Sequence, residues 1–237
     1  MQVVAVAANT GFSLFDLTHL CWLAAMLAFG AMICIFFCLS SEKAKRCTEI
    51  VIGCCIIGLE AAKYIWLIAN SHNLIYYLPL HLCSLAVYIE FLDSVFPNKF
   101  THELCYAICL PGAFSALIFP GWTYEPIGSF LHIHSFLIHF LLVLYPLLLL
   151  ISKRLKPSAA WLPVCFAFTV AAAAFVYYID KLTGMNYMFL ITPPPGSPLE
   201  VFERWWGNPG FLFGYPIIAA AIWILMYVPF ALFRRRN

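Results

Sequence analysis

A cysteine and a histidine carried by two different apolar stretches have the residue types needed for covalent ester chemistry. Cys83 lies in LPLHLCS (78–84), and His139 lies in SFLIHFLLVLYPL (135–147). A thiol attacks an ester as its thiolate, and a nearby imidazole can remove the thiol proton as attack occurs. If both stretches are membrane-spanning helices, each side chain lies roughly 13 Å from the outer end of its helix. Cys83 and His139 are therefore expected at the same depth, near the middle of the membrane, where the two side chains can meet.

Helical geometry also predicts which residues share the face of the expected third span on which Cys83 lies. Two residues along a helix are separated by about 200°. His81 is therefore expected on the face opposite Cys83, and we do not expect it to be the partner of Cys83. Glu90, seven residues after Cys83, is expected on the same face as Cys83.

Further polar side chains are predicted at the outer ends and in the outer halves of the apolar segments. Polar groups inside membrane spans are costly and usually face the interior of a helical bundle. Asn186, Tyr187 or His81 can donate hydrogen bonds to an oxyanion, a contribution of roughly 3 kcal/mol per donor in soluble enzymes. We expect one outward-opening cavity, whose candidate substrate-binding or oxyanion residues are Glu60, Lys63, His81, His134, Asn186 and Tyr187. Asp16, Thr18, His19, His132 and Asp180 are expected around the same cavity.

Each of these groups also has an ordinary structural interpretation. Free cysteine is commonly buried as a small hydrophobic residue, and this applies to Cys83 as well. A histidine of the fifth apolar stretch can simply bond a neighbouring helix. Glu60 and Lys63 are three residues apart, a spacing typical of an ion pair within one helix.

A metal site is an alternative interpretation of the three histidines at 132, 134 and 139. Zinc is held by three or four such ligands that converge on one point. His132 and His139 share a helical face, whereas His134 points away from it. We therefore expect neither a metal nor another cofactor.

The composition predicts a membrane protein. Of the 237 residues, 64% are hydrophobic and only 10% are charged, with a mean hydropathy of +0.90. Soluble domains carry about 25% charged residues. We predict an all-α, polytopic bundle that forms one transmembrane domain over residues 1–237, in a bacterial inner membrane or a eukaryotic endomembrane or plasma membrane. A basic run with interleaved aromatic residues is missing from the sequence, which excludes a nucleic-acid partner.

Seven stretches approach the roughly 20 apolar residues that a spanning helix needs. They cover residues 16–40, 48–70, 74–96, 102–119, 130–152, 158–180 and 210–233. The fourth is short and carries Pro111 and Gly112, so it is expected either to be kinked or to span the membrane only partly. Ten lysines and arginines follow the odd-numbered spans, and two lie in the remaining connections. The excess of positive charge places the N-terminus outside and the C-terminus in the cytosol. The connection 181–209 is expected to be re-entrant or to cap the mouth of the bundle.

Cysteine spacing and the N-terminus exclude two further classes. Ten cysteines are present, but a CxxC pair with a second pair is missing, so we expect neither a disulfide framework nor a zinc framework. The N-terminal stretch MQVVAVAANTGFSLFD has no basic region before its apolar part, and we expect no cleaved signal peptide.

Three segments resemble one known family. LPLHLCSL (78–85), SFLIHFLLVLYPL (135–147) and GMNYMFLITPPPGSPL (184–199) together look like the YwaF-like integral membrane proteins, the family that includes transmembrane protein 164. The resemblance extends from about residue 50 to residue 225. One departure is that bacterial members tend to carry a Thr-Pro-Asp turn after the fourth span, where this chain has Phe119, Pro120 and Gly121.

The resemblance implies lipid chemistry. The eukaryotic member is regarded as a cysteine-dependent acyltransferase of ether-linked phospholipids, whose nucleophile corresponds to Cys83 and whose histidine corresponds to His139. A more distant similarity to androgen-induced transmembrane fatty-ester hydrolases implies ester chemistry as a common theme. We expect a membrane phospholipid or lysophospholipid as substrate and an acyl thioester on Cys83. The alternatives are a fatty-acyl ester hydrolase, a transporter of a small polar solute, and a non-enzymatic scaffold.

Overall fold

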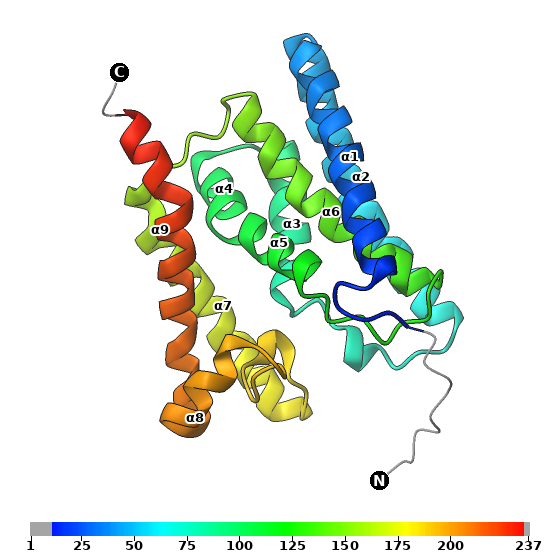
Figure 1. Cartoon of the computed structure of the whole chain (residues 1–237), viewed down its shortest axis with the longest axis vertical. Coiled ribbons are helices and arrows are strands. Elements are labelled where there is room, and N and C mark those ends of the chain that lie inside the picture. Colours follow the sequence, from blue (N-terminus) through cyan, green and yellow to red (C-terminus); the bar gives the residue numbers. More distant parts are fainter. Residues whose placement is uncertain (1–10, 235–237) are drawn as a thin grey trace. The chain divides into compact units, whose positions relative to one another are not determined.

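The regular secondary structure is helical throughout the part of the chain that the computed structural model describes, residues 11–234, with side chains described up to residue 230. This confirms the all-α prediction for these residues. The α-helices, labelled in Figure 1, are α1 (Leu17–Leu39), α2 (Glu42–Ala69), α3 (Leu82–Val95), α4 (Lys99–Leu104), α5 (Leu110–Ile118), α6 (Phe130–Ile151), α7 (Leu162–Thr183), α8 (Pro198–Gly210) and α9 (Gly214–Arg234). Short 3₁₀ or π turns are η1 (Leu74–Tyr77), η2 (Cys105–Cys109), η3 (Ala159–Trp161), η4 (Tyr187–Phe189) and η5 (Phe211–Phe213). The N-terminal stretch in which no signal peptide is expected lies largely outside the described residues, as do Arg235 and Arg236.

Six helical segments among the described residues are long and apolar enough to cross a membrane, judged by length and composition. They are Leu17–Leu39, Glu42–Ala69, Lys99–Ile118, Phe130–Ile151, Ala159–Thr183 and Pro198–Phe230. Each has the roughly 20 residues that the hydrocarbon core requires. The protein is therefore an integral membrane protein.

The segment expected as the third span is not one continuous helix. It begins with the turn η1, continues without helical structure, and becomes α-helical only over Leu82–Val95, which is 14 residues. Pro79 accounts for the delay, because proline lacks an N–H group and disfavours helical conformation in the residue before it. A depth for Cys83 counted along a continuous helix from residue 74 therefore does not apply. The expectation about the face of His81 also fails, because His81 precedes the helix.

The fourth expected span contains the irregularity predicted near Pro111. A π-helical turn, η2, joins α4 to α5, and the N–H of Leu110 bonds to the carbonyl of Cys105, five residues earlier. Pro111 occupies the first turn of α5, where a missing N–H costs little. The π turn thus lets one continuous helical segment accommodate the proline.

The chain forms two compact units. Unit 1 comprises residues 11–73 and 86–156, and unit 2 comprises residues 74–85 and 157–234. The first four residues of α3 belong to unit 2 and the rest of that helix to unit 1.

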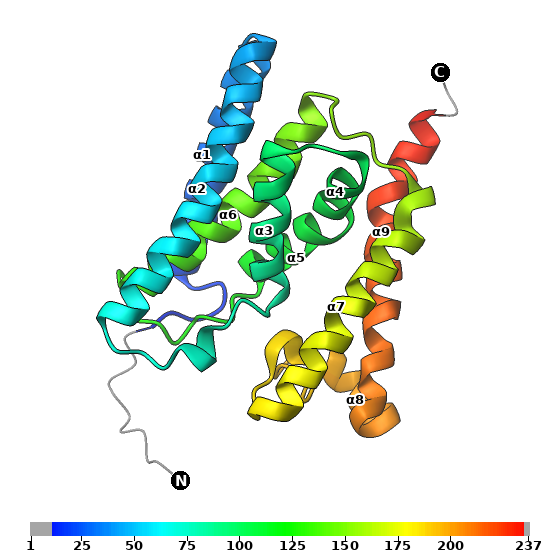
Figure 2. The same ribbon diagram turned by 180° about the vertical axis from the view of Figure 1, so that it is seen from behind.

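In unit 1, α6 is the central helix. It packs against α1, α2 and α5, and α1 with α2 forms a helical hairpin beside it (Figures 1 and 2). Its residue Phe136 is fully buried, stacks on Trp22 with ring centroids 4.8 Å apart, and meets the edge of Trp122 at 5.3 Å. Phe12, Met26 and Leu117 complete this cluster. An apolar helix with aromatic residues on its buried face thus forms the core of the unit.

Basic residues in or next to three different connections meet at one end of unit 1. The guanidinium of Arg154 pairs with the fully buried carboxylate of Glu49 and, at 3.2 Å, with Glu42. Arg46 lies 3.4 Å from the same Glu49 carboxylate, and Lys99 donates to the carbonyl of Lys156 at 2.6 Å. The connections α1–α2 and α3–α4 and the start of the α6–α7 connection therefore lie at the same end of unit 1.

Gly53 marks the closest approach of α2 to α3 within unit 1. A Cβ atom at this position would collide with the side chain of Ser94. We expect Gly53→Ala to destabilise the protein by about 1–3 kcal/mol, because the two helices must separate. Thermal unfolding in detergent would measure the change.

Gly58, five residues further along α2, provides the matched control. A Cβ atom there meets nothing within 4 Å. Gly58→Ala should leave stability unchanged or raise it by up to about 1 kcal/mol, because alanine is the better helix former. Equal unfolding temperatures for the two variants would contradict the close packing at Gly53.

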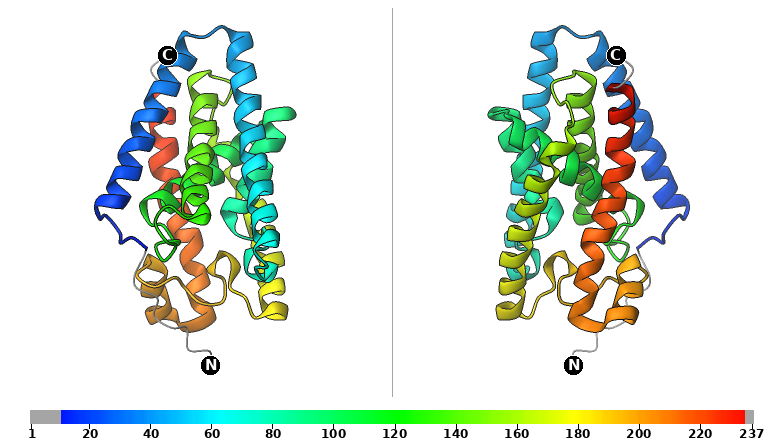
Figure 3. Two further views of the ribbon diagram at one scale, coloured as in Figure 1. Left: turned by 90° about the vertical axis from the view of Figure 1, so that its right-hand side faces the viewer. Right: turned by 90° about the vertical axis from the view of Figure 1, so that its left-hand side faces the viewer.

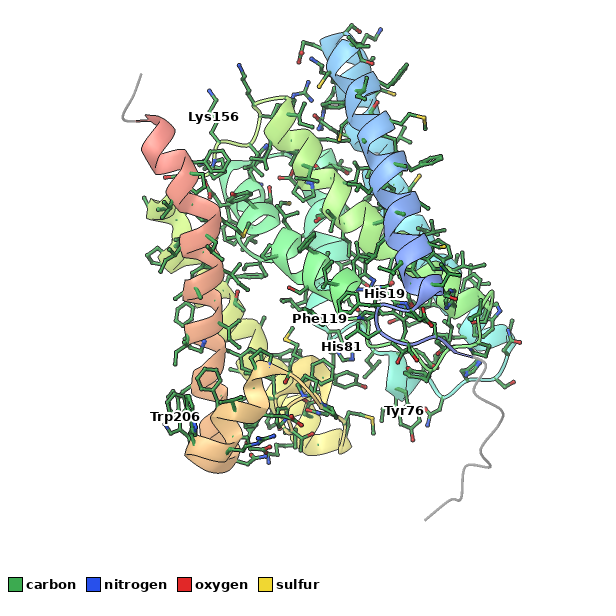
Figure 4. All side chains as sticks on the ribbon, viewed as in Figure 1. His19, Tyr76, His81, Phe119, Lys156 and Trp206 are labelled. Carbon is green, nitrogen blue, oxygen red and sulfur yellow. The ribbon has the colours of Figure 1, made fainter. Side chains whose placement is uncertain are left out.

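In unit 2, α8 and the turn η5 link the long connection after α7 to α9, as Figure 3 shows. The helix α8, except for its last residue, lies within the expected re-entrant or capping connection 181–209. It is amphipathic and exposes Trp205 and Trp206, the second of which is labelled in Figure 4. Tyr187 and Leu190 are buried against Val176 of α7, so the connection packs tightly on its own unit.

Candidate functional site

Cys83 is the second residue of α3, in unit 2. The first backbone N–H groups of a helix have no partner within the helix and carry a partial positive charge. This position favours a negatively charged group such as a thiolate. Cys83 is partly buried, near the start of the helix and not in its middle as the sequence suggested.

His81, labelled in Figure 4, contacts the turn η4. Its Nδ1 atom accepts a hydrogen bond from the backbone N–H of Met188 at 3.3 Å. The imidazole ring meets Tyr187 edge-on, with centroids 5.5 Å apart, and Phe189 at 6.0 Å. Because Nδ1 is the acceptor, the neutral ring carries its proton on Nε2. His81 is therefore a hydrogen-bond donor through Nε2, two residues before Cys83.

Asn186 organises the backbone that follows α7. Its amide oxygen accepts from the N–H of Ile191 at 2.9 Å, and its amide nitrogen donates to the carbonyl and hydroxyl oxygens of Thr192 at 2.9 and 2.8 Å. Both ends of the amide are thus engaged within the turn. In this structure Asn186 shapes the turn, and its expected role as an oxyanion donor stays a prediction.

Tyr187 is held at both its backbone and its side chain. Its N–H donates to the carboxylate of Asp180 at 2.8 Å, and its hydroxyl donates to the carbonyl of Ile75. Burial raises the pKa of the Tyr187 phenol, with the nearby Asp180 charge as a smaller cause. The contact with Ile75 ties the turn to the segment that leads into His81.

His139 is held by a hydrogen bond within α6 and by a ring stack. Its Nδ1–H donates to the carbonyl of Ser135 at 2.6 Å, because a carbonyl oxygen can only accept. The ring stacks on Trp122, with centroids 4.7 Å apart and planes 19° from parallel. In the neutral ring, Nε2 therefore holds the lone pair. The stack on Trp122 could not be read from the sequence, whereas the bond to Ser135, four residues earlier on one helix, could have been anticipated.

The predicted polar group of unit 1 is assembled around Lys63. Lys63 lies 2.6 Å from the carboxylate of Glu60, and both side chains are largely buried. The ion pair within one helix is thus confirmed. Lys63 also interacts electrostatically with His134 and His139. His134 hydrogen-bonds to the backbone of Leu59, and its Nε2 has no hydrogen-bond partner among the described residues.

His132 and His19 serve the packing of unit 1. His132 Nε2 accepts from the indole N–H of Trp22 at 2.9 Å. His19 Nε2 donates to the carbonyl of Leu117 at 2.8 Å, while the carboxylate of Asp16 accepts the N–H of His19 and caps α1. Within the described part of the chain, three or more His, Cys, Asp or Glu side chains do not gather closely enough to hold a metal ion.

The predicted site residues fall into two groups, one in each unit. Cys83, His81, Asn186 and Tyr187 belong to unit 2, where Tyr187 contacts His81 and Ile75 and Asn186 shapes the turn that carries Tyr187. His139, His134, Glu60 and Lys63 belong to unit 1, where they form one cluster. The pairing of Cys83 with His139 stays a prediction.

The helices and the buried polar residues define a polytopic integral membrane protein with two polar clusters. Comparison with protein families adds that residues 14–227 match the TMEM164 family. Because this match covers most of the 237 residues, the chain belongs to the TMEM164 family. Comparisons with curated proteins and with solved structures find no significant match.

Proposed function

We propose that this protein is a membrane-embedded lipid acyltransferase in which Cys83 is the nucleophile and His139 the base. Three features support the proposal: membership of the family, the start of a helix at Cys83, and the orientation of His139. The last carries the most weight. The bond from His139 to the carbonyl of Ser135 leaves Nε2 with the lone pair that a general base requires.

The reaction has two halves. His139 Nε2 takes the proton of the Cys83 thiol as sulfur attacks the carbonyl carbon of a phospholipid ester. The tetrahedral intermediate collapses, the C–O bond breaks, and the leaving lysophospholipid alcohol takes the proton back from His139. An acyl thioester remains on Cys83. In the second half, His139 removes the proton of an acceptor alcohol, that alcohol attacks the thioester, and the thiol is restored.

The remaining cluster residues are assigned to substrate binding. The ammonium of Lys63 supplies a positive charge for a lipid phosphate, and Glu60 holds it in place at 2.6 Å. His134 Nε2 can accept a hydrogen bond from a hydroxyl group of the lipid. The Nε2–H of His81 can donate to the oxyanion of the intermediate.

The experiment is a lipid-exchange assay with the purified protein in nanodiscs. A lysophospholipid and a phospholipid with an isotope-labelled acyl chain are supplied, and mass spectrometry follows the label. Transfer of label to the lysophospholipid supports the proposal, and release of labelled free fatty acid alone would indicate the hydrolase instead. Unchanged lipids would refute both, because neither reaction leaves the lipid pool intact.

A second candidate is transport of a small polar solute, favoured by Glu90. This residue is fully buried in α3, and neither of its carboxylate oxygens has a hydrogen-bond partner among the described residues. Buried carboxylates in membrane proteins often serve ion or proton pathways. This function predicts uptake of a solute into proteoliposomes without any lipid turnover. It also predicts that Glu90→Gln abolishes the uptake.

The acyltransferase proposal includes a topology of seven membrane spans. Six are the long apolar helical segments, and the additional one, third along the chain, is α3 with the segment before it. An odd number places the two termini on opposite sides of the membrane, whereas six spans place them on the same side. We expect an N-terminal epitope tag to be outside and a C-terminal tag to be cytosolic. Antibody access in intact and permeabilised cells measures this, and two tags exposed on one side would contradict seven spans.

A further inference from the structure

Two consecutive residues of the turn η4 have left-handed backbone conformations that non-glycine residues rarely adopt. Met188 has φ 52° and Phe189 has φ 57°. Such conformations persist only where the surrounding structure enforces them, and they are concentrated at functional positions. Here they aim the N–H of Met188 at Nδ1 of His81.

Side chains from three helices or their ends hold the turn in this shape. The hydroxyl of Tyr215, on α9, donates to the carbonyl oxygen of Met188 at 2.8 Å. The same hydroxyl lies 3.1 Å from the carbonyl oxygen of Phe189. Asp180, near the end of α7, accepts the N–H of Tyr187 at 2.8 Å. The amide of Asn208, near the end of α8, donates to the carbonyl of Ile191 at 2.7 Å. The strained backbone is thus fixed from several directions.

We propose that the turn 186–192 is a positioning device for His81, which holds the ring in the tautomer with the proton on Nε2. A histidine without such a contact exchanges between two neutral tautomers, and only one of them presents an Nε2–H donor. The Met188 N–H selects that tautomer, because an Nδ1–H could not accept its hydrogen bond. Tyr215 and Asn186 are positioning residues, since they act on His81 through the backbone of the turn.

The catalytic consequence rests on the proposed function. His81 immediately precedes α3 and lies two residues before Cys83, so its Nε2–H and the first amides of the helix belong to one short segment. Donors of this kind stabilise the oxyanion that forms when a thiolate attacks an ester carbonyl. We therefore expect the Nε2–H of His81 to bind the carbonyl oxygen of a substrate that is an acyl ester.

Nitrogen-15 NMR of histidine-labelled protein in nanodiscs tests the tautomer directly. The His81 signals among the seven histidines are identified by their loss in His81→Gln. We expect a wild-type ring with Nδ1 unprotonated and Nε2 protonated. A ring protonated on Nδ1 would overturn the proposal, whether or not the protein transfers acyl groups.

The variant Tyr215→Phe removes only the hydroxyl that holds the turn. We expect a mixture of the two His81 tautomers and a fall in kcat of about tenfold, with little change in KM. Tyr178→Phe, on an exposed position of α7, is the matched control and should change neither. If Tyr215→Phe does not fold, Asn186→Ala disrupts the same turn from within and should shift the tautomers in the same way.

The outcomes separate this proposal from the proposed function. Absence of acyl transfer in the wild-type protein refutes the function, while the NMR spectra still decide whether the turn sets the tautomer. A fall in kcat with an unchanged tautomer would show a merely structural role for Tyr215 and would overturn the positioning. Unchanged tautomer and unchanged kcat in both turn variants would overturn it as well.

Discussion

Replacing Cys83 with alanine is expected to lower acyl-transfer turnover by about a thousandfold or more. The physical reason is that the covalent route is lost entirely, and removal of an enzyme nucleophile costs at least this much where it has been measured. The rate of label exchange between phospholipid and lysophospholipid, measured in nanodiscs, gives the effect. Cys83 is only partly buried near the start of α3, so the helical fold should survive the change.

Two further cysteine variants serve as controls. Cys54→Ala changes an exposed thiol in the middle of α2 and should retain wild-type turnover. Cys83→Ser keeps the size of the side chain but supplies a much less acidic nucleophile, so it should also be strongly impaired. Turnover of Cys83→Ala within a factor of two of the wild type would exclude this residue as the nucleophile.

Replacing His139 with alanine is the second change with a large expected effect, a loss of about 10²–10⁴-fold in turnover. Without the imidazole, nothing assigned in this account removes the thiol proton as sulfur attacks. The variant also loses the stack on Trp122, and such aromatic pairs contribute about 0.5–1.5 kcal/mol. Turnover and the unfolding temperature therefore need to be measured on the same preparation.

Chemical rescue distinguishes a base from a packing residue at position 139. Imidazole added to His139→Ala can occupy the space that the ring leaves and restore part of the turnover. His72→Ala changes a histidine that follows α2, outside the assigned site, and should behave as wild type. Loss of stability without loss of turnover in His139→Ala would assign the residue to packing alone.

The helical boundaries show which parts of the fold are readable from the sequence. Ser41 and Ser129 each accept the N–H of the residue three positions on, and α2 and α6 begin directly after them. The hydrophobicity of such long stretches predicts the ends of the helices to within a few residues. The exception is the start of α2, which lies at Glu42 and not at the expected residue 48. The pair Glu60 and Lys63 was predictable for the same reason, because its geometry depends on one helix only.

Features that depend on distant contacts were not predictable. The late start of α3 is different, because it has a local cause in Pro79, whose effect is obscured in the sequence by the apolar residues on both sides. The left-handed residues Met188 and Phe189 lie in an apolar stretch without glycine, and their conformation depends on Tyr215, 26 or more positions away. In the candidate site, the residue types can be identified from the sequence. The hydrogen bond that fixes His81 and the stack of the His139 ring on Trp122 depend on distant residues and cannot.

Mass spectrometry of the Cys83 peptide after brief incubation with phospholipid tests the central claim most directly. The account predicts a mass increase equal to one acyl group on Cys83, removed by hydroxylamine as a thioester is, and accumulating when the acceptor lysophospholipid is withheld. Active lipid exchange with an unmodified Cys83, or an acyl group attached to a different residue, would contradict it.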